Sequence, residues 1–268
     1  MKNIVCVKIN CYKGFSYEDT LDGIKKAGFK YLELSTSNGN SLNMCQDMSQ
    51  EDIDKLKKDL NERGLQAIAI GGNSYLMDDD TTKIIKNIKL AKEFNCKYID
   101  VTVYNARNDS EAITSDEDIV NHIKAYIPYL EENNLDLVIE LHGQYSTGNK
   151  ISNILKLVNN NHVHINYDTG NALFWGNLNV EEMLIDFNNN INNISFMHLK
   201  DKLGAINEWN FPAIGKGYIP FEIIFKELSE NITLAVEIEF TAAGVKDVNE
   251  VHQALIDSAT YLKSLGLI

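Results

Sequence analysis

The most informative stretch of this chain for its fold is Asn193-Ile194-Ser195-Phe196-Met197-His198-Leu199-Lys200-Asp201. It is an apolar run that ends abruptly in a histidine, a lysine and an aspartate. Because side chains alternate between the two faces of a strand, Phe196, His198 and Lys200 share one face, and Asp201 points the other way as a partner at the helix rim. Two polar side chains on one face of a buried strand indicate a site at its end.

Similar apolar runs recur along the chain and alternate with amphipathic segments. Strands are predicted at 4–10, 29–34, 65–70, 98–104, 135–142, 163–168, 194–200 and 233–240. Helices are predicted at 16–28, 49–64, 81–94, 115–133, 151–159, 180–189, 220–229 and 248–265. Ser16 and Ser49, each followed three residues later by an aspartate, have the spacing of helix N-caps.

This strict alternation with short connections predicts parallel strands joined by right-handed helical crossovers. Eight such units close into a (β/α)8 TIM barrel, an α/β fold. A doubly wound open sheet is the rival, but it usually carries a Gly-rich phosphate loop after its first strand, where this chain has Cys11-Tyr12-Lys13-Gly14-Phe15. Barrels of this kind commonly occupy about 200 to 250 residues as one domain, so we expect a single TIM-barrel domain over 1–268.

The composition limits the partners of the protein. A formal net charge of -13 and the lack of any basic cluster argue against nucleic acid as a partner. No run approaches the roughly 18 apolar residues of a membrane span, and no secretory leader is visible, so we expect a cytoplasmic protein. The four cysteines have no C-x-x-C spacing and are read as free thiols. A homo-oligomer is left open.

The last four predicted strands each end in a potential metal ligand. These residues are Glu140 in the fifth strand, Asp168 in the sixth, His198 in the seventh, and Glu237 or Glu239 in the eighth. The carboxyl ends of barrel strands form the active site of such folds, so the four side chains should converge. Three carboxylates and one imidazole suit Mn²⁺, Mg²⁺, Co²⁺ or Zn²⁺, and buried carboxylates at close range need a cation.

Further polar residues lie one step along the same strand faces. His142, Lys200 and Glu239 are predicted to face a substrate. For the metal ligand of the eighth strand, alternation alone does not separate Glu239 from Glu237, and the deeper position favours Glu237. Lys8 and Glu33, at the ends of the first two strands, are further candidates for substrate binding, with the alternative that Lys8 neutralises a carboxylate and pairs with Glu33.

Four aromatic residues follow the first and seventh predicted strands. They would either cover a bound substrate or pack the barrel rim: Tyr12, Phe15, Trp209 and Phe211. The Gly-Lys-Gly segment at 215–217 is interpreted as a turn into the helix started by Pro220 rather than as a phosphate-binding loop.

The strand-end motifs resemble those of the sugar phosphate isomerase/epimerase family, the xylose isomerase-like TIM barrels. The motifs are Val-Ile-Glu140-Leu-His142, Asp168-Thr-Gly-Asn171, His198-Leu-Lys200-Asp201 and Val-Glu237-Ile-Glu. The resemblance covers essentially the whole chain. It implies that Glu140, Asp168, His198 and Glu237 take the metal positions, and Asn171 is counted among the substrate contacts.

Two branches of that family differ from this chain at defined positions. Ketohexose epimerases carry a histidine three residues after the strand-six aspartate and an arginine six residues after the strand-seven histidine, where this chain has Asn171 and Gly204. Apurinic endonucleases carry histidines after strands three and four, where this chain has Gly-Gly-Asn at 71–73 and Val-Tyr-Asn at 103–105. A trinuclear DNA-cutting site is therefore not expected.

The resemblance implies a divalent-metal-dependent sugar or sugar phosphate isomerase or epimerase that abstracts a proton next to a carbonyl. Glu140 and Glu237 would act as base and acid on an enediolate, while Lys200 and His142 steady the oxyanion or protonate a leaving group. The alternative is a metal-dependent dehydratase, a lyase, of an inosose-like or keto-sugar substrate. A non-catalytic sugar-binding barrel is the rival from a different class.

Overall fold

Eight parallel strands close into one barrel in the computed structural model, which describes residues 3–72, 74–104 and 115–268. The strands, in barrel order, are β1 (Ile4–Lys8), β2 (Tyr31–Ser35), β3 (Gln66–Gly71), β4 (Tyr98–Val101), β5 (Asp136–Glu140), β6 (Val163–Asp168), β7 (Ile194–Leu199) and β9 (Thr233–Val236). Pairing of β9 with β1 closes the barrel. The predicted (β/α)8 barrel is confirmed.

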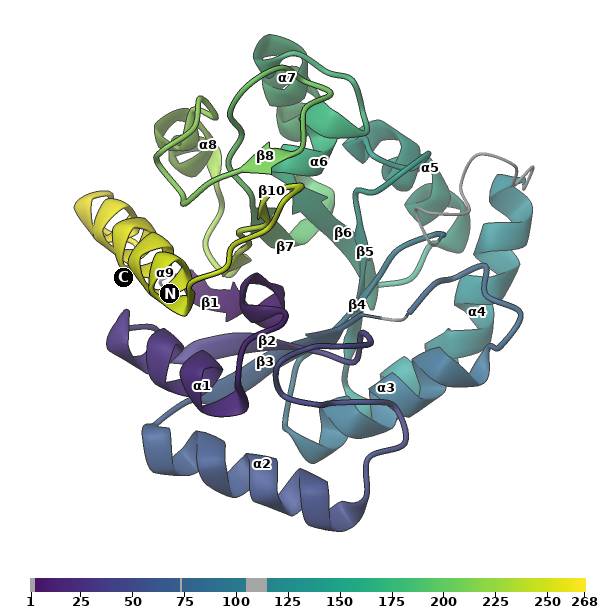
Figure 1. The fold of residues 1–268 in the computed structure, drawn as a ribbon. Coiled ribbons are helices and arrows are strands. Elements are labelled where there is room, and N and C mark those ends of the chain that lie inside the picture. The colour runs from purple at the N-terminus through teal and green to yellow at the C-terminus, as the bar shows by residue number, and fades with distance from the viewer. Residues whose placement is uncertain (1–2, 73, 105–114) are drawn as a thin grey trace.

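Helices surround the strands on the outside (Figure 1). They are α1 (Tyr17–Lys26), α2 (Gln50–Arg63), α3 (Thr82–Glu93), α4 (Asp116–Asn133), α5 (Gly148–Val158), α7 (Val180–Asn190), α8 (Phe221–Glu227) and α9 (Val248–Ser264). Ser16 and Ser49 accept hydrogen bonds from the backbone N–H of Asp19 and Asp52, which confirms both predicted caps. None of the helices in the described ranges is long and apolar enough to cross a membrane.

The interior of the barrel is filled by a small apolar layer beneath a polar one. The apolar layer consists of Cys6, Ile68, Ala69, Tyr98, Val138, Phe196 and Ala235. One step of alternation further along its strand, Cys6 is followed by Lys8 and Phe196 by His198, and both of these polar side chains are inside the mouth of the barrel. The apolar layer therefore forms the floor on which the polar residues rest.

Several predicted strands are wrong at their carboxyl ends, and after two of them the chain takes a path that was not expected. The strand expected at 4–10 stops at Lys8, where the chain turns into the short 3-10 helix η1 (Ile9–Tyr12). The strand expected at 233–240 stops at Val236, and the chain then leaves the barrel by way of Phe240, whose φ is 58°. Its continuation, β10 (Phe240–Thr241), pairs antiparallel with β8 (Asn210–Phe211) instead.

Other strands and connections also differ from the prediction. The strands expected at 98–104 and 135–142 end earlier, at Val101 and Glu140. A short helix that was not predicted, α6 (Thr169–Phe174), follows β6 directly. Asp168 caps it by accepting a hydrogen bond from the backbone N–H of Asn171, and η2 (Ile191–Asn193) likewise precedes β7 without a sequence prediction.

Candidate metal centre

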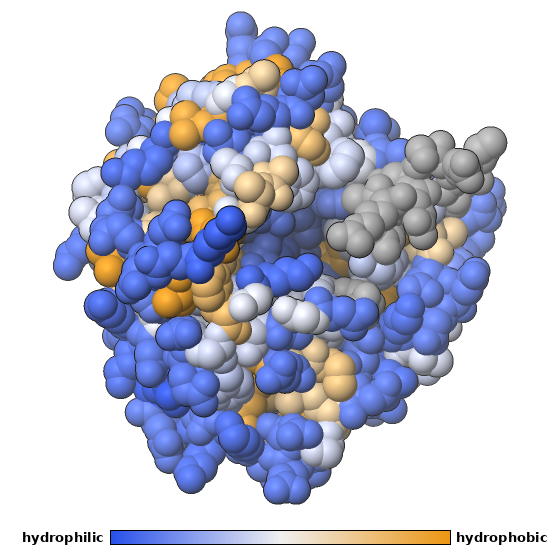
Figure 2. Space-filling view, in the orientation of Figure 1, coloured by the Kyte–Doolittle hydropathy of each residue, from blue (hydrophilic) through white to orange (hydrophobic). Residues whose placement is uncertain are grey.

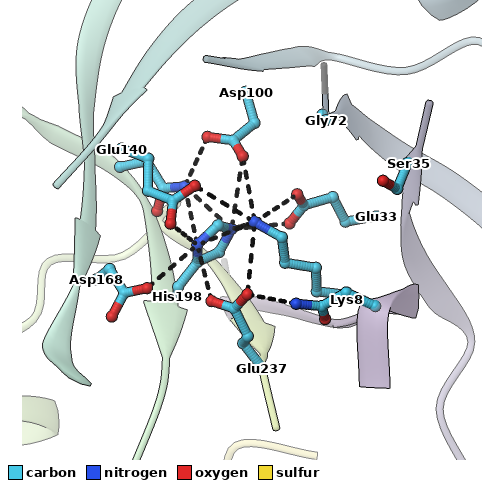
Figure 3. Close-up of polar contacts among 12 residues, drawn as sticks. Lys8, Glu33, Ser35, Gly72, Asp100, Glu140, Asp168, His198 and Glu237 are labelled. Carbon is cyan, nitrogen blue, oxygen red and sulfur yellow. Dashed lines mark hydrogen bonds and ion pairs between the residues drawn. The ribbon is translucent and has the colours of Figure 1, made fainter. Parts of the chain in front are cut away.

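Four buried side chains converge at the carboxyl ends of β5, β6, β7 and β9 (Figure 3). They are Glu140, Asp168, His198 and Glu237, and one ligand atom from each lies within 4.8 Å of the others. His198 Nδ1 is 3.5 Å from Glu140 Oε1, 3.7 Å from Asp168 Oδ2 and 3.3 Å from Glu237 Oε2. The structure thus brings the four predicted ligand residues together, with Glu237 rather than Glu239 in the group.

Strand register explains why these residues meet at one level. Asp168 is the cross-strand neighbour of His198, and the backbone N–H of Glu237 donates to Leu199 O at 3.0 Å. The predicted alternation along β7 also holds, since Phe196 lies in the barrel interior and Leu199 in the core beneath the helices. The sequence order of polar and apolar residues therefore aims His198 into the barrel mouth.

Glu33 contacts Nε2 of His198, whereas the three other carboxylates face Nδ1 of the same ring. Its Oε2 lies 3.0 Å from His198 Nε2, and its side chain is only 1% exposed. With Nε2 paired to Glu33, Nδ1 is the ring nitrogen that faces the other carboxylates and would bind a metal ion, the arrangement common for histidines that bind metals. Burial and Lys8 lower the pKa of His198, but Glu33, Glu237 and Glu140 outweigh them and raise it well above its usual value.

Lys8 places its ammonium among four carboxylates. Its Nζ is 3.4 Å from Glu33 Oε1, Asp100 Oδ2 and Glu140 Oε2, and 3.7 Å from Glu237 Oε1. Lys8 and Glu33 are direct neighbours in the β1–β2 register, so the pairing considered from the sequence is present. Burial lowers the pKa of Lys8, but the carboxylates outweigh it and raise that pKa well above its usual value.

Some carboxylate oxygens of the centre are left without a hydrogen bond, although Lys8 is nearby. Asp168 Oδ2 and Glu237 Oε2 are buried without any hydrogen-bond partner, and both face His198 Nδ1. Lys8 uses different oxygens, Glu140 Oε2 and Glu237 Oε1. Buried acceptors without a donor are costly, and burial raises the pKa of Asp168 to about 7. The residues present therefore fit a divalent ion bound by three carboxylates and one imidazole.

Two predicted substrate contacts instead touch the ligand carboxylates in this structure. Asn171 donates from Nδ2 to Glu140 Oε1 at 3.1 Å and accepts from Lys200 Nζ at 3.3 Å. Lys200 Nζ also lies 3.6 Å from Glu237 Oε2 and 2.5 Å from Glu239 Oε2. Glu239 is thus outside the convergent group and is paired with Lys200. Substrate binding by these residues stays a prediction.

His142, another predicted substrate contact, is next to an aromatic group. Its ring centre lies 5.4 Å from that of Trp175, and both His142 Nδ1 and Trp175 Nε1 are buried without a hydrogen-bond partner. Burial lowers the pKa of His142. A neutral imidazole with an unpartnered nitrogen is suited to a hydrogen bond with a bound hydroxyl.

The aromatic residues near the first and seventh strands do not share one environment. Tyr12 is fully buried, and its hydroxyl lies 2.8 Å from Nδ1 of His252 in α9. Phe15 is partly buried against the main core. Phe211 and Trp209 lie under the ammonium of Lys200, at 4.7 Å and 5.7 Å from it to their ring centres. Only this second pair is next to the candidate centre.

Sequence reasoning missed three polar residues of the centre. Asp100 accepts a hydrogen bond from Asn166 Nδ2 at 2.8 Å, and Asn10 Nδ2 donates to Glu237 Oε1 at 2.6 Å. Burial raises the pKa of Asp100 to about 7. The alternation of side chains along the strand could have revealed Asp100. It comes two residues after Tyr98, a residue of the apolar floor, and therefore also points into the barrel.

Figure 2 shows a hollow over the barrel whose floor is hydrophilic, in the view that looks onto the carboxyl ends of the strands.

Of the positions at which apurinic endonucleases carry histidines, Gly71, Gly72, Val103 and Tyr104 are described and supply no imidazole, whereas Asn73 and Asn105 lie outside the described residues.

Residues 21–265 match the family model described as xylose isomerase-like TIM barrel, so the chain belongs to this family. Similar solved structures include D-psicose 3-epimerase in the presence of D-fructose, with 14% identity, 100% of both chains covered and a TM-score of 0.76. The apo form of 3-keto-D-glucoside 4-epimerase from E. coli has 15% identity, with 98% of this chain and 100% of that chain covered and a TM-score of 0.72.

L-ribulose 3-epimerase has 16% identity, with 100% of this chain and 95% of that chain covered and a TM-score of 0.72. At these identities the likeness shows a shared fold. No protein of curated function matches the sequence significantly.

Proposed function

We propose that the protein is an enzyme, a divalent-metal-dependent sugar or sugar phosphate epimerase or isomerase that removes a proton next to a carbonyl. One observation carries the proposal: Glu140 and Glu237, from different strands, each place a carboxylate oxygen within 3.5 Å of His198 Nδ1. Two carboxylates that face one point can act on both sides of a small substrate. Membership of the xylose isomerase-like family and the sugar epimerases among similar structures support the same class.

The residues that would hold the metal are Glu140, Asp168, His198 and Glu237. When bound, a divalent ion such as Mn²⁺, Mg²⁺, Co²⁺ or Zn²⁺ supplies Lewis acidity towards the substrate carbonyl and a neighbouring hydroxyl. The unpartnered oxygens of Asp168 and Glu237 support this role. Asn171 orients the Glu140 carboxylate through its hydrogen bond to Oε1.

The proton chemistry is assigned to the two glutamates. One of Glu140 and Glu237 removes the proton beside the carbonyl, and the other returns a proton from the opposite side. Return to the other face of the same carbon is epimerisation, and return to the neighbouring carbon is isomerisation. Lys200, whose Nζ lies 3.6 Å from Glu237, donates a hydrogen bond to the oxyanion as it forms. His142 Nδ1 binds a substrate hydroxyl.

A lyase is the second candidate, and the contacts of Lys200 favour it. Its ammonium touches both Glu237 and Glu239, so a proton donor stands beside the acid–base pair. Such a donor can protonate a β-hydroxyl as it leaves, which turns proton abstraction into dehydration of an inosose-like or keto-sugar substrate.

Incubation with Mn²⁺ and a panel of ketoses and inososes in D₂O tests the proposal. Deuterium is expected at the carbon next to the carbonyl, and the product separates epimerisation, isomerisation and dehydration. Absence of exchange from every panel member, in protein that holds metal, would instead favour the non-catalytic sugar-binding barrel. D168A is the control, and if this variant kept stoichiometric metal, the proposed ligand set would be wrong.

A further inference from the structure

The ammonium of Lys8 sits in a shell of carboxylate oxygens. Glu33, Asp100, Glu140 and Glu237 each direct one oxygen at Nζ, at 3.4, 3.4, 3.4 and 3.7 Å. These oxygens come from four different places around the barrel mouth, and Figure 3 shows the side chains pointing inward at the ammonium. His198 Nε2 also lies 3.2 Å from the ammonium. Carboxylates together with one imidazole are ligands that suit divalent cations such as Mn²⁺.

Two of the four carboxylates face two positions at once. Glu140 gives Oε2 to Lys8 and holds Oε1 3.5 Å from His198 Nδ1. Glu237 gives Oε1 to Lys8 and holds Oε2 3.3 Å from the same nitrogen. Each therefore bridges the candidate metal position and the ammonium, as carboxylates do between two neighbouring metal ions.

The other two carboxylates, Glu33 and Asp100, have Lys8 and His198 as their cationic neighbours. Glu33 and Asp100 are 1% and 3% exposed, and among the described residues Lys8 is the only lysine or arginine that pairs with either of them. Glu33 Oε1 has no hydrogen-bond partner. Together with His198, Glu33 and Asp100 also form a second group of potential metal ligands within 4.8 Å. Charge buried in this way requires a cation at this position.

We propose that Lys8 takes the place of a second metal ion. Its ammonium neutralises the oxygen shell from within the chain and so limits the centre to one divalent ion. Without the ammonium, the same four oxygens bind a second hard divalent cation, bridged to the first by Glu140 and Glu237. The inference rests on the proposed metal centre, and the experiment below separates the failure of one from the failure of the other.

The test counts Mn²⁺ ions per chain in wild type and in K8M, which keeps the length and apolar stem of the side chain but loses the charge. Elemental analysis after removal of free metal is expected to give one ion in wild type and two in K8M. Two Mn²⁺ ions bridged by carboxylates couple magnetically, so the electron paramagnetic resonance spectrum of K8M should lose the hyperfine pattern of isolated Mn²⁺.

Two controls separate a second site from a general effect of charge. K200M removes one ammonium beside the same Glu237 but outside the oxygen shell, so it should keep one ion. The double variant K8M/E33Q loses a carboxylate of the shell and should return to one ion. K8Q, which has a polar side chain, replaces K8M if circular dichroism shows that K8M does not fold.

The outcomes are distinct. One ion in both wild type and the folded Lys8 variant overturns the inference and leaves the proposed function intact. Wild type that binds no ion overturns the proposed metal centre, and the inference with it. Two ions in K200M as well would show that net charge alone sets the count, which also contradicts the role given to Lys8.

Discussion

His198 Nε2 lies 3.0 Å from Glu33 Oε2, although the two residues are 165 positions apart in the chain. The contact joins β7 to β2 across the mouth of the barrel. It fixes the ring so that Nδ1 faces Glu140, Asp168 and Glu237, the other members of the candidate centre. Glu33, which the sequence suggested as a substrate contact or a partner of Lys8, thus also positions a candidate metal ligand.

Removal of the Glu33 charge should weaken metal binding. We expect E33Q to lower the affinity for Mn²⁺ by about 10- to 100-fold, because a histidine ligand loses basicity and orientation without its carboxylate partner. Isothermal titration calorimetry measures this directly. E239Q removes a carboxylate that pairs with Lys200 instead of His198, so it should have a smaller effect. Equal losses in the two variants would contradict the orienting role of Glu33.

Asp201 holds the loop before α8 through four backbone groups. Its Oδ2 accepts from the N–H of Gly215 and Gly217 at 2.9 and 2.7 Å, and its Oδ1 accepts from Lys202 and Ile219 at 2.8 and 3.2 Å. D201N replaces an acceptor by an amide donor that faces buried N–H groups. We expect it to lower the free energy of unfolding by about 3 kcal/mol, measured by urea denaturation.

The matched control for this loop is Asp257. It contacts the neighbouring Lys216 on the surface at 3.3 Å, where both side chains are substantially exposed. Surface ion pairs contribute about 0 to 1 kcal/mol, so D257N should change stability by less than D201N does. A D201N protein as stable as D257N would contradict the loop-holding role of Asp201.

Metal should stabilise the fold. The buried carboxylates of the centre outnumber the ammonium groups of Lys8 and Lys200, so a divalent ion relieves their repulsion. After chelation, Mn²⁺ at about 100 times its dissociation constant should add about 2.7 kcal/mol, seen as a higher melting temperature in calorimetry. D168A should show no such shift. A wild-type melting temperature that does not respond to Mn²⁺ would argue against the centre.

The barrel was predictable because its signals are local. Each strand is a short apolar run, each helix has a visible cap or a 3.6-residue pattern, and the strand expected at 163–168 coincides with β6. The convergence of the four candidate ligands was also predictable, since a polar side chain such as His198 at the end of an apolar run breaks its pattern. The expectation of a single domain over 1–268 stays a prediction.

Other features depend on contacts that a linear pattern does not contain. Asp100 lies inside β4 rather than after it. The sequence indicates its inward direction only through its two-residue spacing from Tyr98, which faces the barrel interior. The path after Val236 depends on the positive φ of Phe240 and on pairing with β8, about thirty residues earlier in the chain. The number of carboxylates around Lys8 follows from barrel closure, which brings β1 beside β9.

The most direct test of the account is solvent exchange by E140Q and E237Q at saturating Mn²⁺ with a substrate that wild type exchanges. Both variants keep an amide oxygen at the ligand position but lose the carboxylate base, so we expect retained metal and deuterium incorporation lower by about 10²- to 10⁴-fold. Metal-loaded variants that exchange deuterium at the wild-type rate would contradict the assignment of proton transfer to Glu140 and Glu237.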